Sequence, residues 1–237
     1  MGKQGLGRDS KDRTDLKNLM FNLDLIELPR LERIDGEIRQ YRTPEGLLYP
    51  SVTTVLGAAS DKSGLDNWRK AVGEEEANRV SARAARRGTA VHSLCEKLVL
   101  NEDIDLRSEM PLNVHMYRQL ERELRAHCDD IRGSELFLYS DALKVAGACD
   151  LIASWDGRPS IIDFKTSGKN KKKEWIEGYF LQCSLYSYMF WERTGILHSQ
   201  IVVMISVEEE DKAQIFVENA TKYLNKAKQI CESFHNK

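Results

Sequence analysis

The chain has 237 residues, of which 41% are hydrophobic and 30% are charged, so it is long enough to bury a substantial core. This length is most simply one α/β domain with additions, and no second domain is required. The formal net charge of −2 gives no sign of nucleic-acid binding. Any such binding would depend on local basic patches.

The sequence also bears on the compartment. No segment approaches the roughly 20 apolar residues that span a bilayer, and the charged N-terminus lacks an apolar signal region, so we expect a soluble protein without membrane contact. The five cysteines are widely separated and form no CxxC pair, which favours reduced thiols and a cytoplasmic location. Residues 1 to 17 are expected to form a mobile tail, with residues 18 to 237 as a single domain.

The first predicted elements lie before residue 57. Residues 19 to 31 carry an apolar cluster that either packs on the domain surface or binds a partner. Residues 34 to 49 predict a hairpin with its turn at residues 44 to 46, followed by a short helix. Ser51 and Thr53, at the start of that helix, either donate hydrogen bonds to a phosphate or cap the helix.

Residues 65 to 87 are typical of a helix in composition. The side chains expected toward the core are Trp68, Val72, Ala77 and Val80. Arginines gather near the end of this segment, and most of them share one helical stripe. The stripe either faces a phosphate backbone or is a solvated face balanced by the glutamates at residues 74 to 76. Its members are Arg79, Arg83, Arg86 and Arg87.

Two further helices are predicted before the central strands. Thr89 can cap the first of them, which places His92 in its first turns. A histidine without further context is more often structural or exposed than a metal ligand. The second helix is expected at residues 113 to 128, with an apolar stripe at Met116, Leu120 and Leu124. A strand should follow at residues 135 to 139.

Residues 145 to 167 are typical of a β-hairpin. Both arms are rich in β-branched and aromatic residues, and Asp156-Gly157 between them is a strong signal for a two-residue turn. Such a turn would set Asp150 opposite Asp163, whereas a four-residue turn would set Asp150 opposite Lys165. In either register the three charged side chains share one face, and the other face is apolar core.

The charged face of this hairpin has two interpretations. Two carboxylates and a lysine on a largely apolar hairpin cost stability unless something pairs with them. Oxygen ligands at short separation suit a hard cation such as Mg²⁺ or Mn²⁺, and a nearby lysine could then orient or deprotonate a metal-bound water. The alternative is a half-exposed Asp–Lys ion pair on a sheet surface.

Basic and aromatic residues follow the hairpin. The lysines between residues 169 and 173 form the densest basic patch of the chain and either attract a nucleic-acid backbone or belong to a solvated loop. Trp175, Tyr179 and Phe180 could stack on bases, but at this spacing they more often pack a helix onto a sheet. The remaining elements are a helix at 177 to 193, strands at 201 to 207 and 213 to 217, and an amphipathic helix at 218 to 234.

Four motifs follow one another along the chain. They are the segment at residues 49 to 56, Gly-Thr-Ala-Val-His at residues 88 to 92, Asp150 with Asp163-Phe164-Lys165, and Gln182 with Tyr186. In type, order and spacing they resemble the RecB-like exonuclease branch of the PD-(D/E)XK nuclease superfamily, including its GTxxH and QxxxY motifs. The resemblance covers about residues 36 to 190 and extends to exonucleases of mitochondrial genome maintenance and of phages.

The resemblance implies a restriction-endonuclease-like core, which is an α/β fold with a central mixed β-sheet flanked by helices. It also implies a Mg²⁺- or Mn²⁺-dependent DNA exonuclease that prefers single-stranded DNA and works in DNA replication, recombination or repair, beside protein partners of replication or recombination. A structure-selective endonuclease on the same core and a catalytically inactive DNA-binding module are the alternatives. The late cysteine cluster of some relatives is missing from the sequence, so we expect no iron–sulfur cluster.

The resemblance also assigns roles to individual residues. Lys165 would position the attacking water, and Gln182 would organise the site. The metal ligands that it implies are His92, Asp150, Asp163 and the backbone carbonyl of Phe164, with Glu135 as a further candidate. The DNA contacts that we expect are Ser51, Thr53, Arg83, Arg86, Arg87, Lys169, Lys171, Lys172, Lys173 and Tyr186.

Overall fold

The computed structural model describes residues 20–236, so the tail predicted at residues 1 to 17 lies outside the described residues. Within that range the chain forms a five-stranded mixed sheet in the order β4-β5-β6-β7-β8, in which β6 and β7 run parallel and the other neighbours antiparallel. This is the α/β fold that the sequence predicted. The strands are β4 (Cys128–Ser140), β5 (Val145–Trp155), β6 (Arg158–Ser167), β7 (Gln200–Val207) and β8 (Gln214–Asn219).

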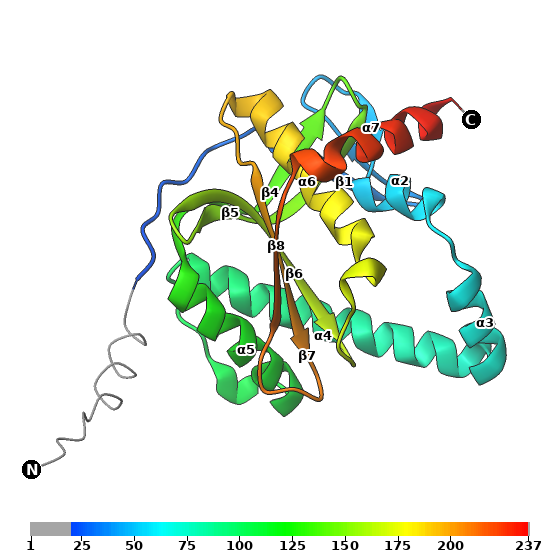
Figure 1. Ribbon diagram of the computed structural model, residues 1–237, viewed down its shortest axis with the longest axis vertical. Coiled ribbons are helices and arrows are strands. Elements are labelled where there is room, and N and C mark those ends of the chain that lie inside the picture. The colour runs from blue at the N-terminus through cyan, green and yellow to red at the C-terminus, as the bar shows by residue number, and fades with distance from the viewer. Residues whose placement is uncertain (1–19, 237) are drawn as a thin grey trace, which may run out of the picture.

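Helices cover both faces of this sheet (Figure 1). One face carries α4 (Glu74–Val99) and α5 (Pro111–His127), and the other carries α2 (Val52–Ala59), α6 (Glu177–Thr194) and α7 (Thr221–His235). The predicted stripe of Met116, Leu120 and Leu124 is fully buried. Each layer encloses its own hydrophobic core, so the sheet separates two apolar clusters. None of the helices within residues 20–236 combines the length and apolar character needed to cross a membrane.

The hairpin of β5 and β6 has the predicted two-residue turn. Trp155 pairs with Arg158 and Leu151 with Ile162, which excludes the four-residue alternative. The turn residues Asp156 and Gly157 have φ angles of 50° and 71°, as a type I′ turn requires. The sequence left two registers open, and the structure has the one that the two-residue turn predicts.

The hairpin is regular only up to the pair of Leu151 and Ile162. Beyond it β6 stays paired with β7 as far as Ser167, whereas β5 stays paired with β4, so β5 and β6 diverge. Cys149 joins the core under α6 and Leu151 joins the core under α4, although an unbroken strand would put both on one face. The alternation is thus interrupted at Asp150. The expectation that Asp150 shares one regular face with Asp163 and Lys165 was wrong.

The predicted helix at residues 65 to 87 was also wrong in its boundaries. The chain forms α3 (Ser63–Val72) and then α4, and Gly73 between them has a φ of 86°, a conformation that breaks a helix. α4 continues through residue 88, and Thr89 donates back to the Ala85 carbonyl at 3.2 Å instead of capping a new helix. Val72 and Val80 are more than a third exposed, because this part of the chain projects beyond the sheet (Figure 1).

The segment before α3 forms a second, smaller sheet. Its strands are β1 (Glu32–Asp35), β2 (Arg39–Arg42) and β3 (Leu48–Pro50). The predicted turn at residues 44 to 46 joins β2 and β3, whereas β1 was not foreseen. The preceding residues run along β4, with a bridge between Leu23 and Ile131, so this apolar segment packs on the domain.

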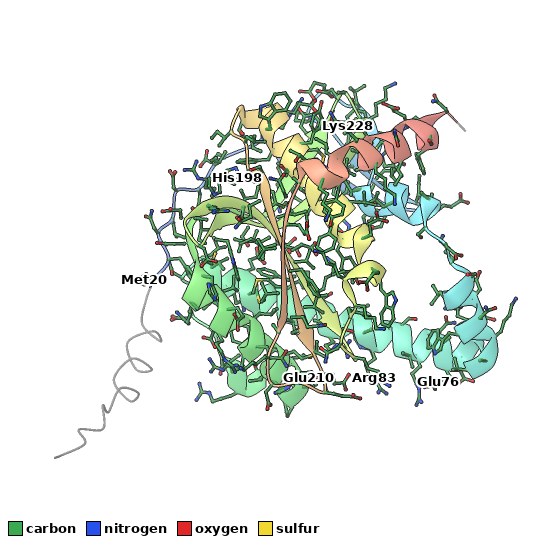
Figure 2. The ribbon with its side chains drawn as sticks, in the orientation of Figure 1. Met20, Glu76, Arg83, His198, Glu210 and Lys228 are labelled. Carbon is green, nitrogen blue, oxygen red and sulfur yellow. The ribbon has the colours of Figure 1, made fainter. Side chains whose placement is uncertain are left out.

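A buried histidine makes the stability of the fold pH-dependent. His198 lies just before β7 (Figure 2), is 1% exposed, and packs edge-on against Phe190. Burial, with a smaller contribution from the charge of Arg132, lowers the pKa of His198 to about 4. The unfolded chain therefore binds a proton on this ring more tightly than the folded protein does. The free energy of unfolding should fall as the pH falls from 6.5 towards 4.

Replacement of this residue measures the effect directly. Between pH 6.5 and 4 the free energy of unfolding of His198→Leu should fall by about 2 kcal/mol less than that of the unchanged protein. The whole pKa shift would give a somewhat larger difference, but solvent screens the contribution of Arg132. Urea denaturation of both proteins at several pH values provides the comparison. Parallel pH profiles for the two proteins would show that His198 does not titrate in this way.

Candidate active site

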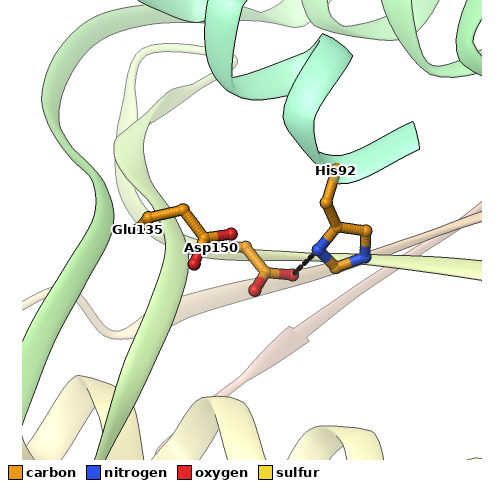
Figure 3. Close-up of side chains that lie close together, drawn as sticks. All are labelled: His92, Glu135 and Asp150. Carbon is orange, nitrogen blue, oxygen red and sulfur yellow. Dashed lines mark ion pairs between the residues drawn. The ribbon is translucent and has the colours of Figure 1, made fainter. Parts of the chain in front are cut away.

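Three potential metal ligands meet where β5 and β6 diverge. His92 of α4, Glu135 of β4 and Asp150 of β5 each offer one ligand atom, and these atoms all lie within 4.8 Å of one another (Figure 3). The His92 Nδ1 is 3.6 Å from the Asp150 Oδ2. Among residues 20–236 this is the one group of three or more histidine, cysteine, aspartate or glutamate side chains whose potential ligand atoms lie this close together. One nitrogen and two carboxylate oxygens are suitable donors for Mg²⁺ or Mn²⁺.

The backbone of Glu135 helps to form this group. Its φ is 47°, a left-handed conformation that is uncommon for a residue other than glycine and is strained within a strand. The residues on either side still pair with β5, Ser134 with Leu151 and Leu136 with Cys149. The irregularity of β4 thus lies opposite Asp150, and it coincides with the point where the two carboxylates come together.

Asp163 and Lys165 form a second group next to the first. Asp163 is 1% exposed, and its carboxylate forms an ion pair with the Lys165 ammonium. Gln182 of α6 donates from its Nε2 to the other carboxylate oxygen, Oδ1, at 3.1 Å. Asp163 was predicted as a ligand together with His92 and Asp150, but it lies outside that group of three and is held by Lys165 and Gln182.

The backbone of Phe164 connects the two groups. Its N–H donates to the Asp150 Oδ2 at 2.8 Å, because the divergence of β5 and β6 leaves this N–H without a partner on β5. Its carbonyl accepts from the Lys165 Nζ at 3.2 Å. The carbonyl was predicted as a further ligand, and the structure places it beside both groups.

The electrostatics of the site favour a bound cation. Burial, together with the nearby charge of Asp150, raises the pKa of Glu135 to about 7. Burial also raises the pKa of Asp163 above its ordinary value, with Lys165 opposing this shift and Asp150 adding to it. Burial lowers the pKa of His92, which keeps its ring neutral and able to bind a metal. A divalent cation would relieve the crowding of these carboxylates, so the donor set fits such an ion.

Lys165 is kept charged by its surroundings. Burial alone would lower the pKa of its ammonium, but Asp163 and Asp150 together raise it above the ordinary value. The Nζ also lies 5.2 Å from the centre of the Tyr179 ring, a distance at which cation and aromatic ring attract each other. A permanent positive charge is therefore fixed beside the three potential metal ligands.

Tyr186 supports Gln182 from the core. Its hydroxyl lies 3.5 Å from the Gln182 Nε2, and only 3% of the residue is exposed. We predicted a DNA contact for Tyr186, which this burial contradicts.

Sequence analysis did not identify Gly147, which packs against Tyr186. A Cβ atom at this position, as in any other residue, would lie 2.9 Å from the Tyr186 ring and hydroxyl. No local pattern marks this glycine, because its neighbour is a distant helix.

The predicted DNA contacts differ in how accessible they are. Ser51 is buried and accepts from the Thr54 N–H as the cap of α2, so its capping role is confirmed. Arg87 forms an ion pair with Glu208 at 2.9 Å, and Lys173 forms one with Glu218. The exposed members of the set are Thr53, Arg83, Arg86, Lys169, Lys172 and Lys173, and Lys171 is half-buried.

Comparison with known proteins agrees with this geometry. Residues 111–235, more than half of the chain, match the PD-(D/E)XK nuclease superfamily. Among solved structures, a "putative exonuclease" from Eubacterium rectale is 13% identical with a TM-score of 0.44, and the match covers 65% of this chain and 66% of that one. None of the curated proteins compared matches this chain. The superfamily match covers more than half of the chain and includes the β5–β6 hairpin and the helix with Gln182. The chain therefore belongs to the PD-(D/E)XK nuclease superfamily.

Proposed function

We propose that the protein is a metal-dependent DNA exonuclease that acts on single-stranded DNA. The observation that carries the proposal is the group of His92, Glu135 and Asp150 beside the Asp163–Lys165 pair. A nuclease is what membership of the superfamily implies. We propose three further properties: a requirement for a divalent metal ion, a requirement for a DNA end, and a preference for single-stranded DNA.

His92, Glu135 and Asp150 would hold the cation, with the Phe164 carbonyl close by. A divalent cation at this position supplies Lewis-acid polarisation of the phosphodiester and of the attacking water. The protein contributes fixed charges around it. The Asp150 carboxylate is held in place by the Phe164 N–H, so this ligand is oriented before substrate binds.

Lys165 places a positive charge where the phosphodiester develops negative charge during hydrolysis. Asp163 and Gln182 act on Lys165 rather than on the substrate, since Asp163 is buried and Gln182 bonds to it. We propose that this pair orients the ammonium toward the attacking water or the phosphate. The exposed lysines of the following loop would attract the DNA backbone without reading its sequence.

The test is cleavage of end-labelled single-stranded and double-stranded DNA with and without divalent cation. We expect release of short products from the single strand in Mg²⁺ or Mn²⁺, and none after EDTA treatment, because the cation would supply the Lewis-acid polarisation that the ligand group itself lacks. A closed single-stranded circle should resist cleavage. Cleavage of the circle would instead identify an endonuclease, and equal cleavage in EDTA would refute the metal requirement.

Substitution of a ligand provides the second arm of this test. Asp150→Asn should reduce cleavage by about 10²-fold or more, because it removes one charged donor and its orienting contact. Asp156→Asn is the matched control: it changes an exposed aspartate in the turn of the same hairpin, where asparagine tolerates the positive φ. Similar activity in both variants would contradict the assignment of the site.

A further inference from the structure

Trp175 is an exposed aromatic residue at the entrance to α6. It ends the short 3₁₀ helix η3 (Lys173–Trp175), and 66% of it is exposed. Phe180, in the first turn of α6, is 1% exposed and packs in the core, as expected for an aromatic residue that holds a helix on a sheet. Packing therefore explains the position of Phe180, whereas the Trp175 ring remains accessible to a ligand.

Tyr179, four residues after Trp175, contacts the candidate active site. Trp175 ends η3, whereas Tyr179 lies in the first turn of α6. Its ring centre is 5.2 Å from the Lys165 Nζ, and the Lys165 ammonium in turn contacts Asp163. The exposed indole is therefore four residues away in the chain from a side chain that contacts the Lys165 ammonium.

Lysines lie close to Trp175, although Glu174 is its immediate neighbour and Lys173 is paired with Glu218. The Lys172 Nζ lies 5.2 Å from the indole centre, and Lys169 of the same loop is exposed. A flat aromatic surface flanked by cations offers both contacts that a single strand of nucleic acid needs, namely stacking for a base and charge for the adjacent phosphates.

We propose that Trp175 is a stacking platform for a base of the single-stranded substrate, with Lys172 binding the neighbouring phosphate. The proposal rests on the proposed function and specifies how that site selects one strand. Inside a duplex both faces of each base are covered by neighbouring base pairs, and only a terminal pair exposes one face, so a surface indole can stack on a duplex only at its end. A single strand exposes its base faces, and stacking is then possible with any base.

Binding measured in EDTA tests this without cleavage. The probe is a fluorescently labelled oligodeoxythymidylate, and the readout is anisotropy. Trp175→Ala should weaken binding about 5- to 100-fold, the range expected for loss of one base–aromatic stack, and Trp175→Phe should retain most of the affinity. Trp191→Ala is the matched control, since Trp191 is also exposed, at 46%, near the other end of α6. It should bind within twofold of the unchanged protein.

An abasic strand of equal length separates stacking from charge. The unchanged protein and Trp175→Ala should bind that strand equally well, because only phosphates remain to be contacted. Equal affinities of Trp175→Ala and Trp191→Ala for the oligothymidylate would overturn the proposal, and so would an equal loss on the abasic strand. If the protein cleaves DNA but Trp175→Ala binds normally, only the platform fails. If the platform result holds without any cleavage, only the proposed nuclease function fails.

Discussion

Replacement of Lys165 by methionine is expected to slow DNA cleavage strongly while single-stranded DNA binding survives. The ammonium is the fixed positive charge beside His92, Glu135 and Asp150, and methionine keeps much of its length and volume without the charge. Loss of a preorganised charge at a reacting phosphate reduces the rate by about 10²- to 10³-fold. Single-turnover cleavage measures the rate, and anisotropy in EDTA measures binding.

The same change should also lower stability, and the two effects can be separated. Lys165→Met leaves the Asp163 carboxylate buried without its cation, which costs about 3 kcal/mol, reduced to the extent that the carboxylate takes up a proton. Adding Asp163→Asn makes the pair neutral and should recover most of this free energy of unfolding without restoring cleavage. Lys212→Met, in an exposed turn, is the matched control and should change neither quantity.

Three outcomes would contradict this assignment. Normal cleavage by Lys165→Met would exclude the ammonium from the reaction. Recovery of both stability and cleavage in the double variant would show that Lys165 acts only by neutralising Asp163. Loss of binding together with cleavage would instead assign Lys165 to holding the DNA backbone.

The β5–β6 hairpin shows which structural features local sequence can predict. The type I′ turn at Asp156-Gly157 fixed the register, and that register follows from dihedral preferences of two residues. The divergence of β5 from β6 does not follow from any local preference. It depends on β7, which keeps β6 paired beyond Ile162, and on Asp150, whose carboxylate satisfies the freed Phe164 N–H.

The exposed arm of α3 and α4 shows a different limit. A helix was predicted through residue 87 from composition, and most of that segment is helical. Periodicity indicated Val72 and Val80 as core residues, yet both are more than a third exposed. α3 and the start of α4, which carry them, project beyond the sheet (Figure 1). An amphipathic pattern predicts which side of a helix is apolar, but whether another element covers that side is decided by the rest of the fold.

Substitution of Gly147 by alanine is expected to lower the free energy of unfolding by about 2 kcal/mol, although it adds only one methyl group. The new Cβ would lie 2.9 Å from the Tyr186 ring and hydroxyl, which is closer than real Cβ contacts occur. Tyr186 is 3% exposed and enclosed by the core, so it cannot move aside freely. Overpacking of this kind costs about 1–3 kcal/mol.

Two variants test that explanation. Gly57→Ala, in α2, meets nothing within 4 Å and should increase stability by about 0.5–1 kcal/mol through helix propensity, so a generic penalty for replacing glycine is excluded. Tyr186→Phe removes the hydroxyl contact and should make the cost of Gly147→Ala smaller by about 0.5 kcal/mol or more in a double-mutant cycle. Additive effects in that cycle would show that the two residues do not interact.

Gly147→Ala should also affect the candidate active site. Tyr186 lies beside Gln182, and Gln182 donates to the Asp163 carboxylate that holds Lys165. A displacement of the tyrosine ring would therefore shift the support of the Lys165 ammonium, to which we assign the catalytic role, and no residue for which we propose a DNA contact. We expect Gly147→Ala, under conditions where it is fully folded, to reduce the cleavage rate and leave the affinity for single-stranded DNA unchanged. An unchanged rate would show that the contact stabilises the core without positioning Lys165.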